Sequence, residues 1–195
     1  PNEAIEITLD NNLKFKTRLV DCVGYLVDNA IGYLEDDMPR MVKTPWSDDE
    51  IPFESAAEIG TKKVIEEHST IGILVTTDGS VTGIPREDYI KAEERVVNEL
   101  KSLNKPFIIL LNSVEPNSQY AQELAKTLTD KYHTSVIPIN CEYLNIDDIN
   151  NIFSKVLYEF PANQIKIKFP RWLDGLDFSH PLKSKLFEEI KDAFM

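Results

Sequence analysis

The first 23 residues alternate between apolar and polar positions, a pattern that predicts a β-hairpin with one buried face. The apolar positions on either side of an Asp-Asn-Asn turn are Ile5, Ile7, Leu9, Leu13, Phe15 and Leu19. The second strand is predicted to continue to Val23, with one acid, Asp21, interrupting its apolar run just before Gly24.

Residues 25–52 follow no period and are predicted to form a long loop. Three prolines divide this stretch, and its acidic clusters, Asp36-Asp37 and Asp48-Asp49-Glu50, are expected to be solvated. A structureless loop of this length is unusual inside a compact domain and is more often functional or disordered.

From Phe53 onward, apolar residues at helical spacing alternate with short apolar runs. The predicted helices cover 54–68, 86–103, 118–132 and 146–158, and the predicted strands cover 71–75, 106–111 and 136–139. This order indicates an α/β domain with a parallel sheet covered on both faces. The runs at 71–75 and 107–111 lack alternation, which is typical of central strands buried on two sides.

The pattern changes near Pro161, which predicts two domains, 1–161 and 162–195. In the second part, residues 164–169 alternate like a half-exposed strand and residues 182–194 form an amphipathic pattern typical of a helix.

Composition narrows the classes of function. The formal charge of −12 argues against a broad phosphate-binding surface, so no nucleic-acid partner is expected. Two cysteines, Cys22 and Cys141, are too few for a disulfide framework or a cysteine-based metal site. No apolar run approaches the roughly 20 residues that a membrane span needs. We therefore expect a cytoplasmic protein.

Polar residues follow each predicted strand, and in an open parallel sheet ligands bind beyond these carboxyl ends. Asp21, three residues before Gly24, forms the D-x-x-G pattern of nucleotide hydrolases. There the carboxylate holds a hydrated Mg²⁺ and the glycine allows the backbone to approach the terminal phosphate. The alternative is an aspartate that only caps the following loop.

Asn112 and Ser113 end another predicted strand, where GTPases carry Asn-Lys-x-Asp. Here the run continues Val114-Glu115, so the lysine is missing and the acid is one methylene longer, which does not support guanine specificity. A nucleotide contact and a plain strand-to-helix turn both remain open.

The main phosphate-binding motif is absent from the 195 residues, because no Gly-Lys pair occurs in them. Gly60-Thr61-Lys62 lies inside a predicted helix with no preceding strand and is no substitute. No glycine-rich turn suits a flavodoxin-like or dehydrogenase domain, and the three histidines have no metal-like spacing.

Several longer stretches resemble the stage IV sporulation protein A family, the spore-coat morphogenetic ATPases of endospore-forming Firmicutes. They include Leu19–Tyr25, Pro39–Met41, Thr44–Trp46, Ile51–Phe53, Ala56–Thr61, Glu67–Gly72, Thr76–Gly79, Ala92–Val96 and Leu157–Pro161. The resemblance covers residues 3 to 161 and is looser beyond them.

The resemblance implies a GTPase-like P-loop NTPase domain of three layers, here without its first strand and P-loop, followed by the start of a second α+β domain. It implies ATP and Mg²⁺ as cofactors, with Asp21 as the Walker B aspartate that holds Mg²⁺ through water and Gly24, Asn112 and Ser113 near the nucleotide. In the family, the P-loop lysine and the sensor threonines lie upstream of the residues that match here.

The family also implies partners and a location. Hydrolysis of ATP drives self-assembly into a polymer on the forespore surface, in the mother-cell cytoplasm. A small amphipathic membrane peptide anchors this layer, peripheral to the forespore membrane, and other coat proteins build on it. We expect the isolated chain to hydrolyse ATP no faster than background and to be poorly soluble, because its strand edges lack partners. The alternative is a structural module that assembles and binds coat proteins without nucleotide turnover.

Overall fold

The computed structural model describes residues 3–9, 14–36, 38–160, 167–177 and 179–193. The chain divides into two compact units, Pro1–Phe160 and Pro161–Met195. The strands are β1 (Ile5–Thr8), β2 (Lys14–Thr17), β3 (Leu34–Glu35), β4 (Met38–Pro39), β5 (Met41–Thr44), β6 (Ser47–Pro52), β7 (Gly72–Thr77), β8 (Phe107–Asn112) and β9 (Val136–Ile139). The α-helices are α1 (Phe53–Lys63), α2 (Arg86–Ser102), α3 (Gln119–Tyr132), α4 (Ile146–Tyr158), α5 (Arg171–Asp174) and α6 (Pro181–Ala193).

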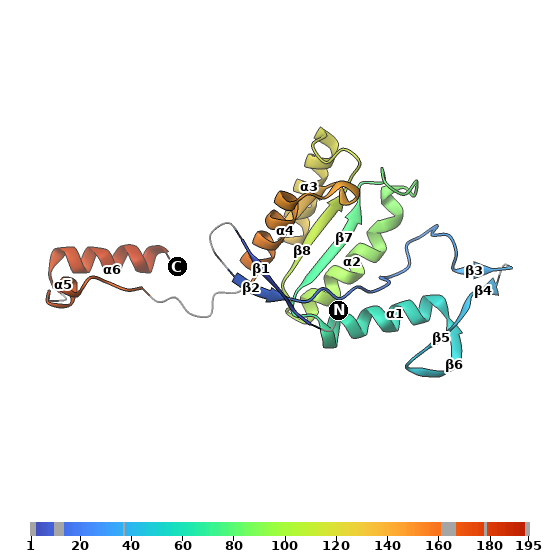
Figure 1. The fold of residues 1–195 in the computed structure, drawn as a ribbon. Helices are drawn as coiled ribbons and strands as arrows, with labels where there is room; N and C mark the ends of the chain where they lie inside the picture. The colour runs from blue at the N-terminus through green and yellow to red at the C-terminus, as the bar shows by residue number, and fades with distance from the viewer. Residues whose placement is uncertain (1–2, 10–13, 37, 161–166, 178, 194–195) are drawn as a thin grey trace. The chain divides into compact units, whose positions relative to one another are not determined.

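The centre of the first unit is a parallel sheet in the order β7-β8-β9 (Figure 1). Thr77 pairs with Asn112, and Asn112 pairs with Ile139, so the three strands end at one edge. The α/β class, the parallel sheet and all three predicted strands are therefore confirmed.

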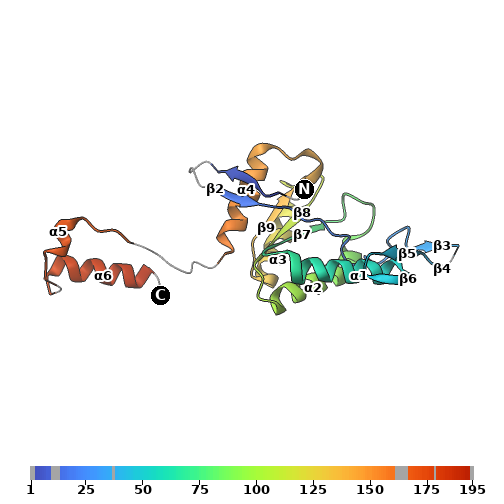
Figure 2. The same cartoon turned by 60° about the horizontal axis from the view of Figure 1, so that its bottom comes forward.

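Alternate residues of β8 face two separate cores. Phe107, Ile109 and Leu111 pack against α2 and α3, whereas Ile108 and Leu110 face the opposite side, where α4 lies (Figure 2). Burying such a side chain contributes about 1.5–3 kcal/mol, so β8 is the most strongly stabilised strand of the sheet. This two-sided burial explains why its sequence shows no alternation.

Strand β7 departs from the prediction of two-sided burial. It pairs only with β8 among the described residues, and the side chain of Val75 is 56% exposed. At its start, a Cβ on Gly72 would lie 3.0 Å from Leu100 and 3.3 Å from Phe107, so glycine allows α2 to approach the sheet closely. The expected unpartnered edge at 71–75 is thus present.

The predicted N-terminal hairpin is confirmed in part. β1 and β2 are antiparallel, with Ile7 opposite Phe15, and the Phe15 ring lies 5.6 Å from that of Phe153 on α4. The turn at 10–13 lies outside the described residues. The extension of the second strand to Val23 is wrong, because β2 ends at Thr17 and residues 18–27 pair with no described strand.

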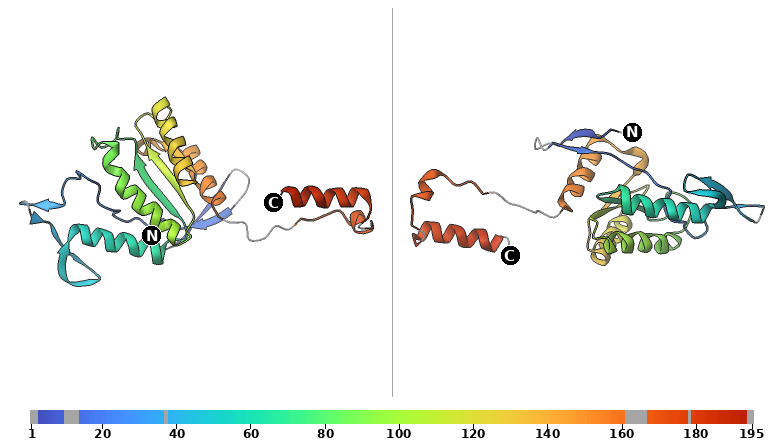
Figure 3. Two further views of the ribbon diagram at one scale, coloured as in Figure 1. Left: turned by 180° about the vertical axis from the view of Figure 1, so that it is seen from behind. Right: turned by 90° about the horizontal axis from the view of Figure 1, so that it is seen from below.

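The prediction of a structureless loop over 25–52 is also wrong. Two antiparallel hairpins, β3-β4 and β5-β6, occupy its second half (Figures 1 and 3). The acids Asp48, Asp49 and Glu50 lie on β6 and are exposed, as expected. The sequence pattern does not indicate these strands because none of them joins the apolar sheet. β5 and β6 lie against α1 instead, where the Trp46 ring would be 3.5 Å from a Cβ at Gly60.

The predicted helices are confirmed, and local signals fix their ends. α1 continues into a π-helical turn, Val64–His68, whose carbonyl groups accept hydrogen bonds from the Lys105 ammonium group. Asn145 and Asp148 form a capping box at the start of α4. Gly60-Thr61-Lys62 lies within α1, as predicted.

The second unit contains α5 and α6. The helix predicted at 182–194 is confirmed as α6. In this unit the Phe169 and Phe187 rings lie 5.7 Å apart, and the Lys183 ammonium group donates to the Leu176 carbonyl. Half of the strand predicted at 164–169 lies outside the described residues, and residues 167–169 are not in a strand.

Candidate functional site

The carboxyl ends of β7, β8 and β9 form one polar edge. The Asn112 amide oxygen accepts the Cys141 N–H at 2.9 Å, and the Ser113 N–H donates to the Ile139 carbonyl at 2.9 Å. The Asp78 N–H donates to the Asn112 carbonyl at 3.3 Å. Three of the four strand ends that the sequence marked as polar therefore lie together.

Asp78 organises this edge. Its carboxylate accepts hydrogen bonds from the Ser80 N–H at 3.0 Å and the Ser80 hydroxyl at 2.5 Å, and also interacts with the Ser113 hydroxyl. Burial alone would raise the pKa of Asp78, but the hydrogen bonds from Ser113 and Ser80 outweigh it, so the pKa lies below its ordinary value. Asp78 is therefore a fixed negative charge that shapes the loop after β7.

The two candidate nucleotide contacts on β8 are engaged inside the protein. Ser113 is 1% exposed, and its hydroxyl accepts the Glu115 N–H at 3.1 Å. The Asn112 side chain holds the start of the turn at Cys141, as described above. Both residues build the edge of the sheet, and a direct contact with a nucleotide stays a prediction.

Asp21 and Gly24 lie beside β7. They line a groove of about 350 Å³ whose opposite wall is formed by residues 71–75 and whose floor includes Thr61 and Leu100. A second groove of about 340 Å³ continues it between residues 16–20 and 68–73. Together the two grooves lie between the segment 16–24 and residues 68–75, which include most of the free edge of β7.

The Asp21 carboxylate is exposed, and no hydrogen bond or ion pair of the described residues engages it. Such a group suits a hydrated Mg²⁺, which is commonly bound by one or two carboxylates together with phosphate oxygens and water. The part of the chain that the structure describes contains no group of three or more His, Cys, Asp or Glu placed to hold a metal ion by itself. Asp21 therefore fits a metal that arrives with a phosphate ligand, and its role stays a prediction.

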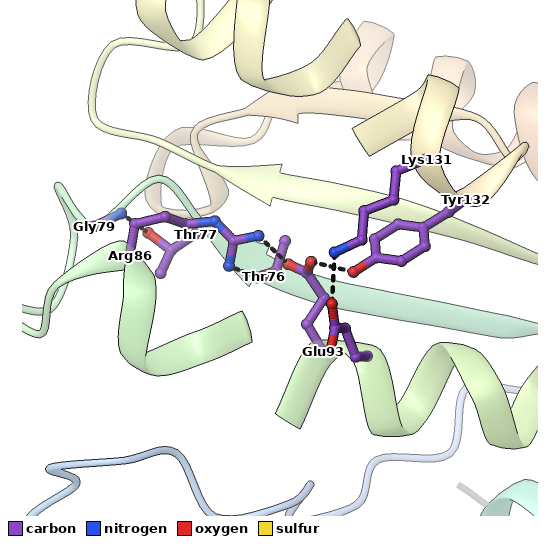
Figure 4. A network of polar contacts seen from close by, with 8 residues as sticks. Thr76, Thr77, Gly79, Arg86, Glu93, Lys131 and Tyr132 are labelled. Atoms are coloured by element: carbon purple, nitrogen blue, oxygen red, sulfur yellow. Dashed lines mark hydrogen bonds and ion pairs between the residues drawn. The ribbon is translucent and has the colours of Figure 1, made fainter. Parts of the chain in front are cut away.

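A buried ion pair ties α2 to the sheet and to α3 (Figure 4). Arg86 donates to Glu93 at 2.6 Å and to the Thr76 hydroxyl at 3.4 Å, and the Tyr132 hydroxyl donates to Glu93 at 2.8 Å. Arg86 and Glu93 are 9% and 3% exposed. Burial and the hydrogen bond to Glu93 raise the pKa of Tyr132 to about 12, so its hydroxyl remains a donor at neutral pH.

A second network holds the chain that follows Gly24. The Gly24 N–H donates to the Thr61 hydroxyl at 3.0 Å, and the Tyr25 hydroxyl donates to Glu99. The Arg95 guanidinium group lies 4.0 Å from the centre of the Tyr25 ring. Tyr25 itself is buried, at 8% exposure, whereas its partner Arg95 remains partly open to water, with 45% of its side chain exposed.

Sequence reasoning missed both networks, although one signal was available. Glu93 occupies an apolar position of the α2 stripe, three residues after Ile90 and four before Val97, and Arg86 precedes it by two helical turns. An acid on the core side of a helix needs a buried partner. Nothing comparable marks Tyr25 or Thr61, because their partners are distant in the sequence.

Comparison with known proteins identifies the family. The model of the family "Stage IV sporulation protein A, ATPase domain" matches residues 1–161. The chain belongs to this family. Proteins named stage IV sporulation protein A are similar to it over its whole length: that of Clostridioides difficile (strain 630) is 46% identical over 195 residues, all of this chain and 40% of the relative.

Two Bacillus relatives agree with this. The stage IV sporulation protein A of Bacillus anthracis is 46% identical and that of Bacillus subtilis (strain 168) is 43% identical, each over 99% of this chain and 39% of the relative. The chain thus spans about two fifths of the length of its curated relatives, and the similarity extends beyond residue 161. No solved structure matches it significantly. No helix among the described residues is long and apolar enough to cross a membrane.

Proposed function

We propose that residues 1–161 are the nucleotide-hydrolysing part of a spore-coat scaffold protein that cleaves ATP with the help of Mg²⁺. The observation that carries this proposal is the match of these residues to an ATPase-domain family, combined with a parallel sheet whose carboxyl ends are polar. The reaction is the in-line attack of water on the terminal phosphate, for which positioning and charge neutralisation supply most of the rate.

The groove beside β7 supports a P-loop NTPase arrangement. Its walls are the free edge of β7 and the segment that carries Asp21, and its lining is largely apolar, including Val20, Ile73 and Leu74. A single additional β-strand would satisfy the unpaired backbone groups of β7 and cover this lining. In a GTPase-like domain, the strand that leads to the phosphate-binding loop occupies this place.

In this arrangement the chain's own residues have separate tasks. Asp21 would hold the Mg²⁺ through water, and Gly24 would lie near the terminal phosphate, where a side chain would obstruct the approach of the backbone. The chemistry that Mg²⁺ would supply at this place is neutralisation of charge on the phosphates. Asp78, with its lowered pKa, keeps the loop after β7 in place at the polar edge.

We propose that hydrolysis drives self-assembly of the protein on the forespore surface, with an amphipathic membrane peptide and other coat proteins as partners. This biological role is proposed from the family alone.

The decisive experiment substitutes Asp21 in the full-length protein. Asp21→Ala should abolish ATP hydrolysis and leave the melting temperature unchanged, because the carboxylate is exposed and makes no described contact. Asp48→Ala on β6 is a matched control, since Asp48 is also exposed, and it should keep full turnover. Unchanged hydrolysis by Asp21→Ala would reject the assignment.

A second candidate is a structural module that assembles without turnover. The absence of any Gly-Lys pair in these 195 residues favours it for the chain taken by itself. Titration with ATP, with and without Mg²⁺, separates the two, because a ligand that binds only the folded state raises the melting temperature. A rise that depends on Mg²⁺ supports the ATPase, and no rise in the full-length protein supports the structural module.

A further inference from the structure

The segment that follows the D-x-x-G pattern is attached to helices α1 and α2 through its first two residues, Gly24 and Tyr25. The Gly24 N–H donates to the Thr61 hydroxyl of α1 at 3.0 Å, and Thr61 is 2% exposed. Gly24 has a φ of +84°, a conformation that a side chain would strain. The glycine is thus held in one orientation by a buried acceptor.

The next residue makes the second attachment. The Tyr25 ring lies against the Arg95 guanidinium group, and its hydroxyl donates to Glu99, both on α2. Arg95 in turn is paired with Glu58 on α1. The two helices and the intervening segment therefore share one polar cluster, and the segment runs between them in Figures 1 and 3.

The donor state of this tyrosine is stable. Burial and the hydrogen bond to Glu99 raise the pKa of Tyr25 well above its ordinary value, despite the opposing charge of Arg95. The groups that face the hydroxyl and ring are Glu99 and Arg95, with Glu58 behind them. The attachment consequently persists throughout the neutral pH range.

Farther along, the attachments become weaker. Asp28 pairs with Lys91 at 2.5 Å and Asn29 donates to Asp88 at 2.8 Å, but these contacts are exposed to solvent. Exposed ion pairs contribute little to stability, because water competes for both charged groups. Gly24 and Tyr25 are therefore the points that fix the segment.

We propose that Thr61 and Tyr25 are positioning residues that set the place of Asp21 and Gly24 for nucleotide hydrolysis. This inference rests on the proposed function. Asp21 is four residues from Tyr25, and four residues of chain reach at most about 14 Å, so a fixed Tyr25 limits where the carboxylate can lie. A misplacement of about 1 Å can lower a rate by about 100-fold.

Thr61 offers a sharp test because two substitutions separate shape from hydrogen bonding. Thr61→Val keeps the volume and removes the acceptor, whereas Thr61→Ser keeps the hydroxyl. In the full-length protein, Thr61→Val should lower kcat by at least about 10-fold with the KM for ATP changed less than about 3-fold, and Thr61→Ser should restore most of kcat. Tyr25→Phe, which keeps the ring, should lower kcat by about 3- to 10-fold.

Thr134→Val is the matched control. Thr134 is 7% exposed and its hydroxyl donates to the Phe107 carbonyl, at the end of β8 away from the polar edge. This variant also loses a hydrogen bond between a threonine hydroxyl and the backbone, although here the hydroxyl is the donor, and it does not touch Gly24. It should lower the melting temperature and keep kcat. Equal loss of kcat in Thr134→Val and Thr61→Val would overturn the inference, as would wild-type kcat in both Thr61→Val and Tyr25→Phe.

Hydrogen exchange of the Gly24 amide gives a readout that does not depend on hydrolysis. Without nucleotide, exchange at Gly24 should accelerate about 10-fold or more in Thr61→Val and stay unchanged in Thr134→Val. An unchanged rate in Thr61→Val would overturn the anchoring. Absence of ATP turnover in the wild type would instead reject the proposed function and the kinetic role with it, while the exchange result would still decide the anchoring.

Discussion

Helix α2 carries two Arg–Glu networks on different sides, and they differ in burial. The pair formed by Arg86 and Glu93 is 9% and 1% exposed at its side chains, whereas Arg95 and Glu58 are 45% and 37% exposed. The first joins α2 to the sheet and to α3, and the second joins α2 to α1 and the segment after Gly24. The buried Arg–Glu pair therefore stabilises the packing of α2 on the sheet and α3, whereas the exposed pair helps to position the segment that follows Gly24.

The difference follows from solvation. A buried charge that loses its partner cannot regain water, so breaking such a pair is costly even when forming it contributes little. An exposed pair exchanges protein contacts for water at small cost. The buried network is therefore expected to govern folding, and the exposed one to govern local geometry.

The largest effect is expected from Arg86→Met. It leaves the Glu93 carboxylate buried with only the Tyr132 hydroxyl, and should lower the free energy of unfolding by about 3–5 kcal/mol. The double variant Arg86→Met/Glu93→Leu should recover much of this loss, because no charge remains buried. Urea unfolding of the three proteins checks both statements, and a double variant as unstable as the single one would contradict the solvation argument.

A medium effect is expected from Tyr132→Phe, with a distinct pH dependence. The pKa of Tyr132 is raised to about 12 by burial and by Glu93. In the unfolded chain it is about 10, so the stabilisation is complete below pH 10 and is lost as the pH rises from about 10 to about 12. Tyr132→Phe should cost about 1–2 kcal/mol at neutral pH and flatten this decline.

Unfolding in urea at several alkaline pH values measures this slope. Tyr120→Phe serves as the control, because Tyr120 is 57% exposed and should leave the slope unchanged. Tyr25 contributes its own alkaline decline in every variant, so the comparison concerns the difference between variants. Parallel curves for wild type and Tyr132→Phe would argue against the buried contact.

A smaller effect on stability is expected from Arg95→Met. The loss of an exposed ion pair and of a contact with the Tyr25 ring should lower the free energy of unfolding by about 0.5–1.5 kcal/mol. The hydrogen bond from Arg95 lowers the pKa of Glu58, so the variant should return that pKa toward its ordinary value in an NMR titration. A loss as large as that of Arg86→Met would erase the distinction between the two networks.

The smallest effect is expected from Lys131→Met at the rim of the buried network. The Lys131 ammonium group pairs with Glu94 at 2.7 Å and lies 4.8 Å from the centre of the Tyr132 ring, but it is partly exposed. Stability should change by at most about 0.5 kcal/mol. The pKa of Tyr132 should rise further because the nearby cation lowers it, and the absorbance of tyrosinate during alkaline titration checks this.

The sequence allowed the strand and helix order from α1 to α4 to be predicted because burial imposes a period on each element. β8 has to be apolar from Phe107 to Leu111 since both of its faces are covered there, and the helices show their buried stripe. The hairpins at 34–52 were not predicted because they bury few residues, and three of the six residues of β6 are exposed acids. A segment that buries few side chains therefore shows no periodic pattern of apolar residues in its sequence.

The candidate site was predictable only in part. The polar residues at the ends of β7, β8 and β9 could be placed at one edge because parallel strands end on the same side. The location of Asp21 beside β7 could not, since it depends on contacts of residues 24 and 25 with α1 and α2 rather than on the strand pattern. Hydrogen bonds between residues 37 and 74 positions apart leave no periodic trace.

Gly72 is the residue of β7 at which α2 packs closely on the sheet. The helix that carries both networks rests on the sheet at this residue, where Leu100 is already in close contact. A methyl group there would lie 3.0 Å from the Leu100 methyl groups and 3.3 Å from the Phe107 Cβ, so either these side chains give way by a few tenths of an ångström or α2 moves away from the sheet. Gly72→Ala distinguishes the two outcomes: a shift of α2 would disturb both of its Arg–Glu networks, whereas repacking of Leu100 alone would leave them intact.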